Sequence, residues 1–155
     1  MPDTVQIQLA ASDDEIAACH AVMHQLRPHV PAEGFVARIR RMEAQRFRLA
    51  YARHENGAVS TVAGFRILEQ LGSGQVLYVD DLVTDQEVRS RGDGAAMLAW
   101  LEAYAREHEC DYLELDSGVW RADAHRFYFR RGLTILGFHF RTAPLRTSAP
   151  ILRPA

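Results

Sequence analysis

The segment Val88–Ala96 (VRSRGDGAA) constrains the fold of this 155-residue chain most strongly, because it joins a strand pattern to a helix pattern. The preceding stretch, Val76–Thr84 (VLYVDDLVT), has the apolar and β-branched composition of a strand. The following stretch, Gly94–Glu109, carries apolar residues at the spacing of an amphipathic helix: Met97, Leu98, Leu101 and Tyr104. A strand that continues into a helix begins a β-α-β crossover, so the sequence predicts a sheet with a helix packed on it.

Further strand and helix patterns flank this unit. Predicted strands cover Val5–Leu9, Phe47–Ala52, Val59–Leu68, Tyr112–Asp116 and Leu133–Arg141, and predicted helices cover Ser12–Arg27, Pro31–Glu43 and Ala122–Arg131. The predicted order is therefore β-α-α-β-β-β-α-β-α-β. Antiparallel strands precede the crossovers, which predicts an α/β (α+β type) fold with a mixed, mostly antiparallel central sheet and helices on both faces.

Residues 1–141 are predicted to form a single domain, followed by a proline-containing C-terminal tail over residues 142–155. The length is that of one domain, and the 48% of hydrophobic residues can supply one core. The tail TAPLRTSAPILRPA holds three of the six prolines, which is typical of irregular structure.

Charge and composition exclude several classes of protein. A net charge of −2 provides no basic field for nucleic acid or an anionic membrane. No apolar run reaches the about 18–20 residues of a membrane span, and the N-terminal sequence lacks a signal pattern, so we expect a cytoplasmic protein without nucleic-acid or membrane partners. All 18 basic residues are arginine, which excludes a Walker-type phosphate loop and a pyridoxal phosphate enzyme, since both need lysine.

Residues that bind metals are sparse. Cys19 and Cys110 are too far apart for a CxxC site, and each is expected to be a small apolar residue. His20 and His24 are spaced to share a helix face but have no third ligand in view, so we predict no metal site.

The turn itself has the features of an anion site. Gly92 and Gly94 let a ligand approach the backbone closely, and the first N–H groups of the following helix lack helical partners. With the helix dipole and the charges of Arg89 and Arg91, they suit a pyrophosphate. An ordinary surface turn with solvated arginines is the alternative. A dinucleotide-binding loop is a weaker one, because Met97 replaces its third glycine and seven residues separate the strand from Gly92.

Two segments carry recognisable motifs. Arg89–Gly94 (RSRGDG) has the pattern [QR]-x-x-G-x-[GA] between a strand and a helix, and Ala124–Leu133 (AHRFYFRRGL) has the pattern A-x-x-F-Y-x-x-x-G-[FL] on the last predicted helix. In this order the chain resembles the GNAT superfamily of acyl-CoA-dependent N-acetyltransferases, whose acyl-CoA motif is the first of the two. The resemblance covers about residues 5–141 and implies a GNAT-like fold.

The resemblance implies that acetyl-CoA binds as co-substrate along the end of one strand and the turn. Its pantetheine arm would pair with the strand backbone, and its pyrophosphate would lie on the backbone N–H groups of the turn. The predicted cofactor-binding residues are Leu82, Val83, Thr84, Arg89, Ser90, Arg91, Gly92, Asp93, Gly94 and Ala95. Asp93 would contribute its N–H group, and its side chain suits a helix N-terminus.

The resemblance also makes Tyr128 the predicted general acid, because family members often use a tyrosine there to protonate the leaving CoA thiolate. A phenol donates a proton as charge develops and stays protonated between turnovers. The alternative is a core tyrosine packed among Phe127, Phe129 and Trp120. His125 is expected to be a surface or packing residue.

Asp80 and Asp81 are the candidates for the general base that takes the proton of the attacking amine. They are consecutive in a predicted strand, where neighbouring side chains point to opposite faces unless a bulge intervenes. At least one is expected to reach solvent or an arginine, because burying both unpaired is costly. The alternative is a salt-bridged patch without proton transfer, and a water-relayed base would make neither carboxylate essential.

The predicted function is N-acetyl transfer, in which an acetyl group passes from acetyl-CoA to a primary amine by direct attack in a ternary complex. The acceptor is a small-molecule or peptide amine, and the sequence does not select between them. The tail could pack on a second copy, which leaves a homodimer open as a partner. The alternative function is a non-catalytic CoA-binding sensor or regulatory module, against which Tyr128 argues, since a sensor needs no acid.

Overall fold

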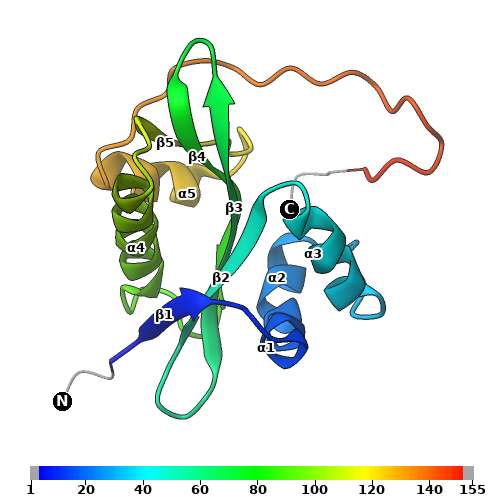
Figure 1. The fold of residues 1–155 in the computed structure, drawn as a ribbon, viewed down its shortest axis with the longest axis vertical. Helices are drawn as coiled ribbons and strands as arrows, with labels where there is room; N and C mark the ends of the chain where they lie inside the picture. Colours follow the sequence, from blue (N-terminus) through cyan, green and yellow to red (C-terminus); the bar gives the residue numbers. More distant parts are fainter. Residues whose placement is uncertain (1–3, 152–155) are drawn as a thin grey trace. The chain divides into compact units, whose positions relative to one another are not determined.

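A computed structural model describes residues 4–151 of the chain, which divide into two compact units at Leu115 and Asp116. The first unit contains a five-stranded sheet with the order β1-β2-β3-β4-β5 (Figure 1). The strands are β1 (Gln6–Leu9), β2 (Phe47–Arg53), β3 (Val59–Gln70), β4 (Gly74–Thr84) and β5 (Tyr112–Leu115). The first four pair antiparallel and β5 pairs parallel with β4, which confirms the predicted mixed, mostly antiparallel sheet.

Helices cover both faces of this sheet, as predicted (Figure 1). Helices α1 (Asp13–Ala18), α2 (His20–Leu26) and α3 (Phe35–Glu43) lie on one face and α4 (Asp93–Glu107) on the other. Strand β2 shows the alternation that separates the two cores: Leu49 and Tyr51 face the first three helices, whereas Ala50 and Ala52 face the side of α4.

The predicted helix from Ser12 to Arg27 is interrupted at Cys19. Its start is confirmed, because Ser12 Oγ accepts from the Glu15 N–H at 3.2 Å and Glu15 accepts from the Ser12 N–H, which forms a capping box. At Cys19 the backbone N–H donates to the Ile16 carbonyl, three residues back, at 3.1 Å. This tighter bond ends α1 and separates it from α2.

A β-bulge lies in the long β3–β4 pair beside the two aspartates. Gly64 pairs with Asp81 and Phe65 with Val79, so Asp80 is the extra residue. A Cβ at Gly64 would lie 2.5 Å from the Phe47 ring and 2.9 Å from the Asp81 carboxylate, so only glycine fits there. The sequence left open whether a bulge interrupts the strand at Asp80 and Asp81, and the structure has one there.

In the second unit, α5 (Ala122–Arg130) confirms the helix predicted over residues 122–131. The strand predicted over Leu133–Arg141 is wrong, because these residues form no strand and Ile135, Leu136, Phe138 and Phe140 are exposed. The alternating apolar pattern satisfies strand propensity, but a strand also needs a ladder partner, and α5 is the only regular element among the described residues of this unit. The residues that follow the predicted strand include Pro144 and Pro150, which have no backbone N–H group to donate to a strand partner. The single domain 1–141 and the tail 142–155 remain predictions.

Candidate functional site

The end of β4 presents a strand edge with one neighbour. Strand β5 pairs with β4 only from Val76 to Val79, whereas β4 continues to Thr84 with β3 as its partner. Within the described sheet, the backbone groups between Leu82 and Thr84 that point away from β3 therefore face no neighbouring strand. These are the residues predicted to pair with an extended polar ligand.

The turn after β4 leads directly into the N-terminus of α4. The Asp85 N–H donates to the Ser60 carbonyl at 2.7 Å, which ties the start of the turn to β3. Ser90 and Gly92 have φ values of +70° and +92°, and Gly92 is the N-cap of α4. Such left-handed conformations are easily adopted by glycine and turn the chain sharply into the helix.

The first N–H groups of α4 have no acceptor within the helix. The first helical bond runs from the Ala96 N–H to the Gly92 carbonyl at 2.9 Å, and no side chain caps the helix. The N–H groups of Asp93, Gly94 and Ala95 therefore remain at the positive end of a 15-residue helix. This arrangement can bind a phosphate group.

Arginine side chains add positive charge beside these amides. Arg89, Ser90 and Arg91 are all exposed, and Arg89 Nε donates to the Thr84 carbonyl at 3.4 Å. That contact holds the Arg89 side chain near the strand end. The structure thus brings the predicted strand-end and turn residues together in one continuous segment.

Asp93 differs from its neighbours in the turn because its side chain is buried. Its Oδ2 lies 2.7 Å from Nε2 of His54, in the β2–β3 hairpin, and the two side chains are 6% and 9% exposed. His54 was not singled out as a site residue from the sequence. No local pattern connects the two residues, which are 39 positions apart.

Asp80 and Asp81 each form an ion pair with an arginine. Arg66 donates to both oxygens of Asp80, at 2.6 and 3.1 Å, and Arg27 donates to Asp81 Oδ1 at 2.7 Å. Burial raises the pKa of the Asp81 carboxyl above its usual range, and the charge of Arg27 opposes this rise. The expectation that at least one carboxylate reaches an arginine is confirmed for both, and Arg27 and Arg66 were not singled out from the sequence.

In the second unit, Tyr128 lies on the half-buried face of α5. Burial raises the pKa of its phenol, and the nearby charge of Arg121 opposes the shift. The ring of Phe127 is 5.4 Å away, whereas Trp120 and Phe129 are exposed, so the predicted aromatic cluster is reduced to one neighbour. His125 Nε2 lies 2.9 Å from the Gly118 carbonyl, in agreement with a packing role.

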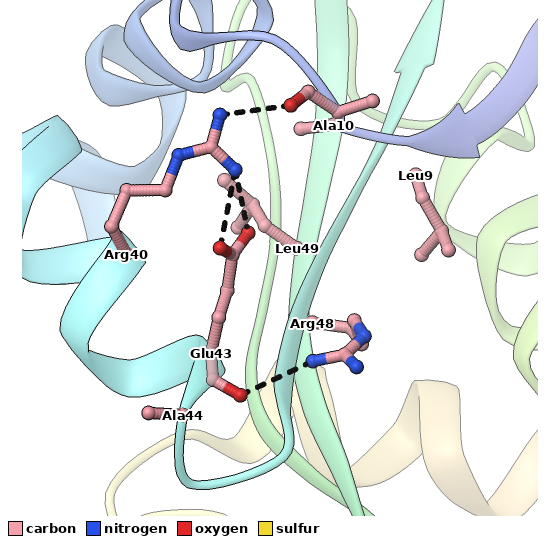
Figure 2. Close-up of a pocket in the computed structure, with 8 residues that line it drawn as sticks. Leu9, Ala10, Arg40, Glu43, Ala44, Arg48 and Leu49 are labelled. Atoms are coloured by element: carbon pink, nitrogen blue, oxygen red, sulfur yellow. Dashed lines mark hydrogen bonds and ion pairs between the residues drawn. The ribbon is translucent and has the colours of Figure 1, made fainter.

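A cavity of about 500 Å³ lies elsewhere in the first unit, among β1, α3 and β2 (Figure 2). Two of its charged side chains are paired with each other: Arg40 donates to both oxygens of Glu43 at 3.1 and 3.2 Å, and also to the Ala11 carbonyl at 2.8 Å. It contains none of the predicted site residues.

Among residues 4–151, no group of three or more metal-ligating side chains comes together, and no helix is long and apolar enough to span a membrane.

Comparisons of the sequence with known proteins agree on one family, and a solved structure shares its fold. A model of the acetyltransferase (GNAT) family matches residues 9–133. Over 138 residues the chain is 30% identical to the uncharacterized N-acetyltransferase YhdJ of Bacillus subtilis, covering 88% of this chain and 97% of the relative. Over 126 residues it is 29% identical to an aminoalkylphosphonate N-acetyltransferase of Salmonella typhimurium, covering 81% and 79%. A solved aminoglycoside N-acetyltransferase in complex with CoA matches with a TM-score of 0.79 at 13% identity, covering 94% of this chain and 98% of that one.

Proposed function

The chain belongs to the GNAT acetyltransferase family and is an acyl-CoA-dependent N-acetyltransferase, and from that premise we propose how its residues act. An acetyl group passes from acetyl-CoA to a primary amine by direct attack in a ternary complex. No observation on the described residues favours a non-catalytic CoA-binding sensor. The observation that carries the proposal is the row of N–H groups at the start of α4, which one turn connects to a strand edge with one neighbour.

We assign the two halves of CoA to these two features. The pyrophosphate binds the N–H groups of the turn between Arg89 and Ala95, where the helix dipole and two exposed arginines favour an anion. The pantetheine arm, which carries amide groups, pairs with the backbone of Leu82, Val83 and Thr84.

The chemistry needs one proton to leave the amine and one to reach the sulfur. The amine nitrogen forms a bond to the thioester carbonyl carbon, the carbon–sulfur bond breaks, and the CoA thiolate takes the phenolic proton of Tyr128. The raised pKa of Tyr128 keeps the phenol protonated at neutral pH, as a general acid requires. The proton lost by the amine passes to the base and then to solvent, from which the phenol regains its proton.

Asp81 is the better candidate for the base, because its raised pKa lies closer to neutrality. A base acts in its deprotonated form, so turnover should rise with pH through a pKa above the usual aspartate range. Asp81→Asn should remove this acid limb and lower kcat about tenfold. Arg27→Met should move this rise in turnover to higher pH, because the variant loses the positive charge that lowers the pKa of Asp81. Rate–pH profiles of the three proteins test this, and an unchanged profile in Asp81→Asn would leave only a structural ion pair.

The acceptor is proposed to be the primary amine of a small molecule or a peptide. Because Asp80 and Asp81 are both paired with arginines, the strand does not present the net negative charge that would select a polycation. The Salmonella relative is named for aminoalkylphosphonates, which are small primary amines, so such amines come first in a substrate panel.

We also propose a cytoplasmic location and a homodimer. Cys19 and Cys110 are free thiols, which suits a reducing compartment. The exposed apolar side chains between Ile135 and Phe140 offer a surface for a second copy.

Titration calorimetry with acetyl-CoA, followed by a thiol-release assay over a panel of amines, tests the function. The panel should contain aminoalkylphosphonates, amino acids, an aminoglycoside and a short peptide. Binding with thiol release on one class supports the proposal and names the acceptor. A protein that binds no acetyl-CoA would overturn the assignment of the turn.

A further inference from the structure

The buried pair of His54 and Asp93 occupies an unusual place, at the junction between the turn and α4. Asp93 is the first residue of α4 and follows the N-cap Gly92. The side chains of Arg89, Ser90 and Arg91 are exposed, whereas the Asp93 carboxylate points inward and meets His54 at 2.7 Å. A charged side chain is therefore held inside the segment that presents backbone N–H groups outward.

A carboxylate buried to this extent needs a hydrogen-bond donor. Without one, burial of the carboxylate is costly, and the side chain would turn toward solvent. The His54 ring supplies the donor from the β2–β3 hairpin, which is a separate element from the turn. Because Asp93 is bonded covalently to Gly92 and Gly94, fixing its side chain also limits rotation of the N–H groups on either side of it.

We propose that His54 is a positioning residue for acetyl-CoA, which holds the Asp93 carboxylate on the inner side of the turn. This has two effects: the N–H groups of Asp93, Gly94 and Ala95 stay directed toward the ligand, and a negative charge stays away from the pyrophosphate. The inference rests on the proposed binding of CoA at this turn. It adds a residue from a hairpin that neither of the two family motifs contains.

A purely structural role would make a different prediction. If the pair only stabilised the fold, its loss would lower the melting temperature and leave the affinity for CoA and kcat unchanged in the folded protein. If His54 positions the turn, its loss should raise the acetyl-CoA Kd and KM while kcat at saturating acetyl-CoA stays within about twofold.

His54→Leu tests this with calorimetry, steady-state kinetics and thermal unfolding on the full chain. The Kd for acetyl-CoA should rise about tenfold, because the released carboxylate turns toward the pyrophosphate. His54→Gln should bind nearly as wild type, since the Gln amide can donate from a similar position. Glu55→Leu is the matched control, because it places the same new side chain on an exposed neighbour in the same hairpin.

The double variant His54→Leu with Asp93→Leu provides the decisive comparison. Removal of the carboxylate should bring the acetyl-CoA Kd part of the way back, to about threefold above wild type, because no charge is left to oppose the pyrophosphate while the N–H groups remain unfixed. A His54→Leu protein that binds acetyl-CoA as wild type would overturn the inference, and so would a double variant no better than the single one. Failure of the wild type to bind acetyl-CoA would instead overturn the proposed function.

Discussion

Gly92→Val is expected to abolish acetyl-CoA binding, with a rise in Kd of at least about a hundredfold. Gly92 has a φ of +92°, which a β-branched side chain rarely adopts, so valine would force the turn to change. No heavy atom lies within 4 Å of the position that a Cβ would take. The new methyl groups therefore project into open space beside the N–H groups that the pyrophosphate needs. The variant should lose its affinity for acetyl-CoA for this reason.

Gly34→Val is the matched control for this variant. Gly34 is also a helix N-cap in the left-handed region, at φ +76°, and a Cβ there would likewise meet nothing within 4 Å. It precedes α3, which takes no part in the proposed site. Calorimetry and thermal unfolding should show a similar loss of stability in both variants and a loss of binding only in Gly92→Val. Normal CoA binding by Gly92→Val would mean that the turn is not the pyrophosphate site.

Local patterns in the sequence predicted most of the sheet and the turn. Ser12, as an N-cap residue, indicated the start of the first helix, and Asn56 and Gly57 between two strand patterns are typical of a hairpin such as β2–β3. The turn before α4 was identified because glycine and arginine lie between a strand and an amphipathic helix. Each of these signals spans fewer than about ten residues, the range over which backbone preference decides structure.

The side-chain pairs of the site lie beyond that range. Arg27 meets Asp81 across 54 positions and His54 meets Asp93 across 39, so only the folded sheet brings them together. Asp80 and Asp81 were singled out as a pair, but which arginine each would bind depends on the bulge opposite Gly64. The strand predicted over Leu133–Arg141 was wrong for a related reason. Alternating apolar residues indicate only a preference for extended backbone, whereas a strand also needs a hydrogen-bonding partner that lies elsewhere in the chain.

Tyr128→Phe is expected to lower kcat about a hundredfold while leaving the Kd for acetyl-CoA nearly unchanged. The substitution removes the donor and keeps the ring, so the contact with Phe127 remains. An acid works in its protonated form, and burial raises the pKa of this phenol. The kcat of the wild type should therefore stay constant until the pH exceeds the usual pKa range of tyrosine, and then fall. In Tyr128→Phe this fall of kcat at alkaline pH should disappear.

Tyr112→Phe serves as the control, because Tyr112 is an exposed tyrosine at the start of β5. Its kcat and pH profile should match those of the wild type. An unchanged rate in Tyr128→Phe would remove Tyr128 from the mechanism and leave the thiolate to be protonated by water. Because Gly92→Val should change Kd and Tyr128→Phe should change kcat, the two variants separate binding from chemistry: a Tyr128→Phe protein that also lost affinity would show that the phenol holds CoA rather than protonating its sulfur.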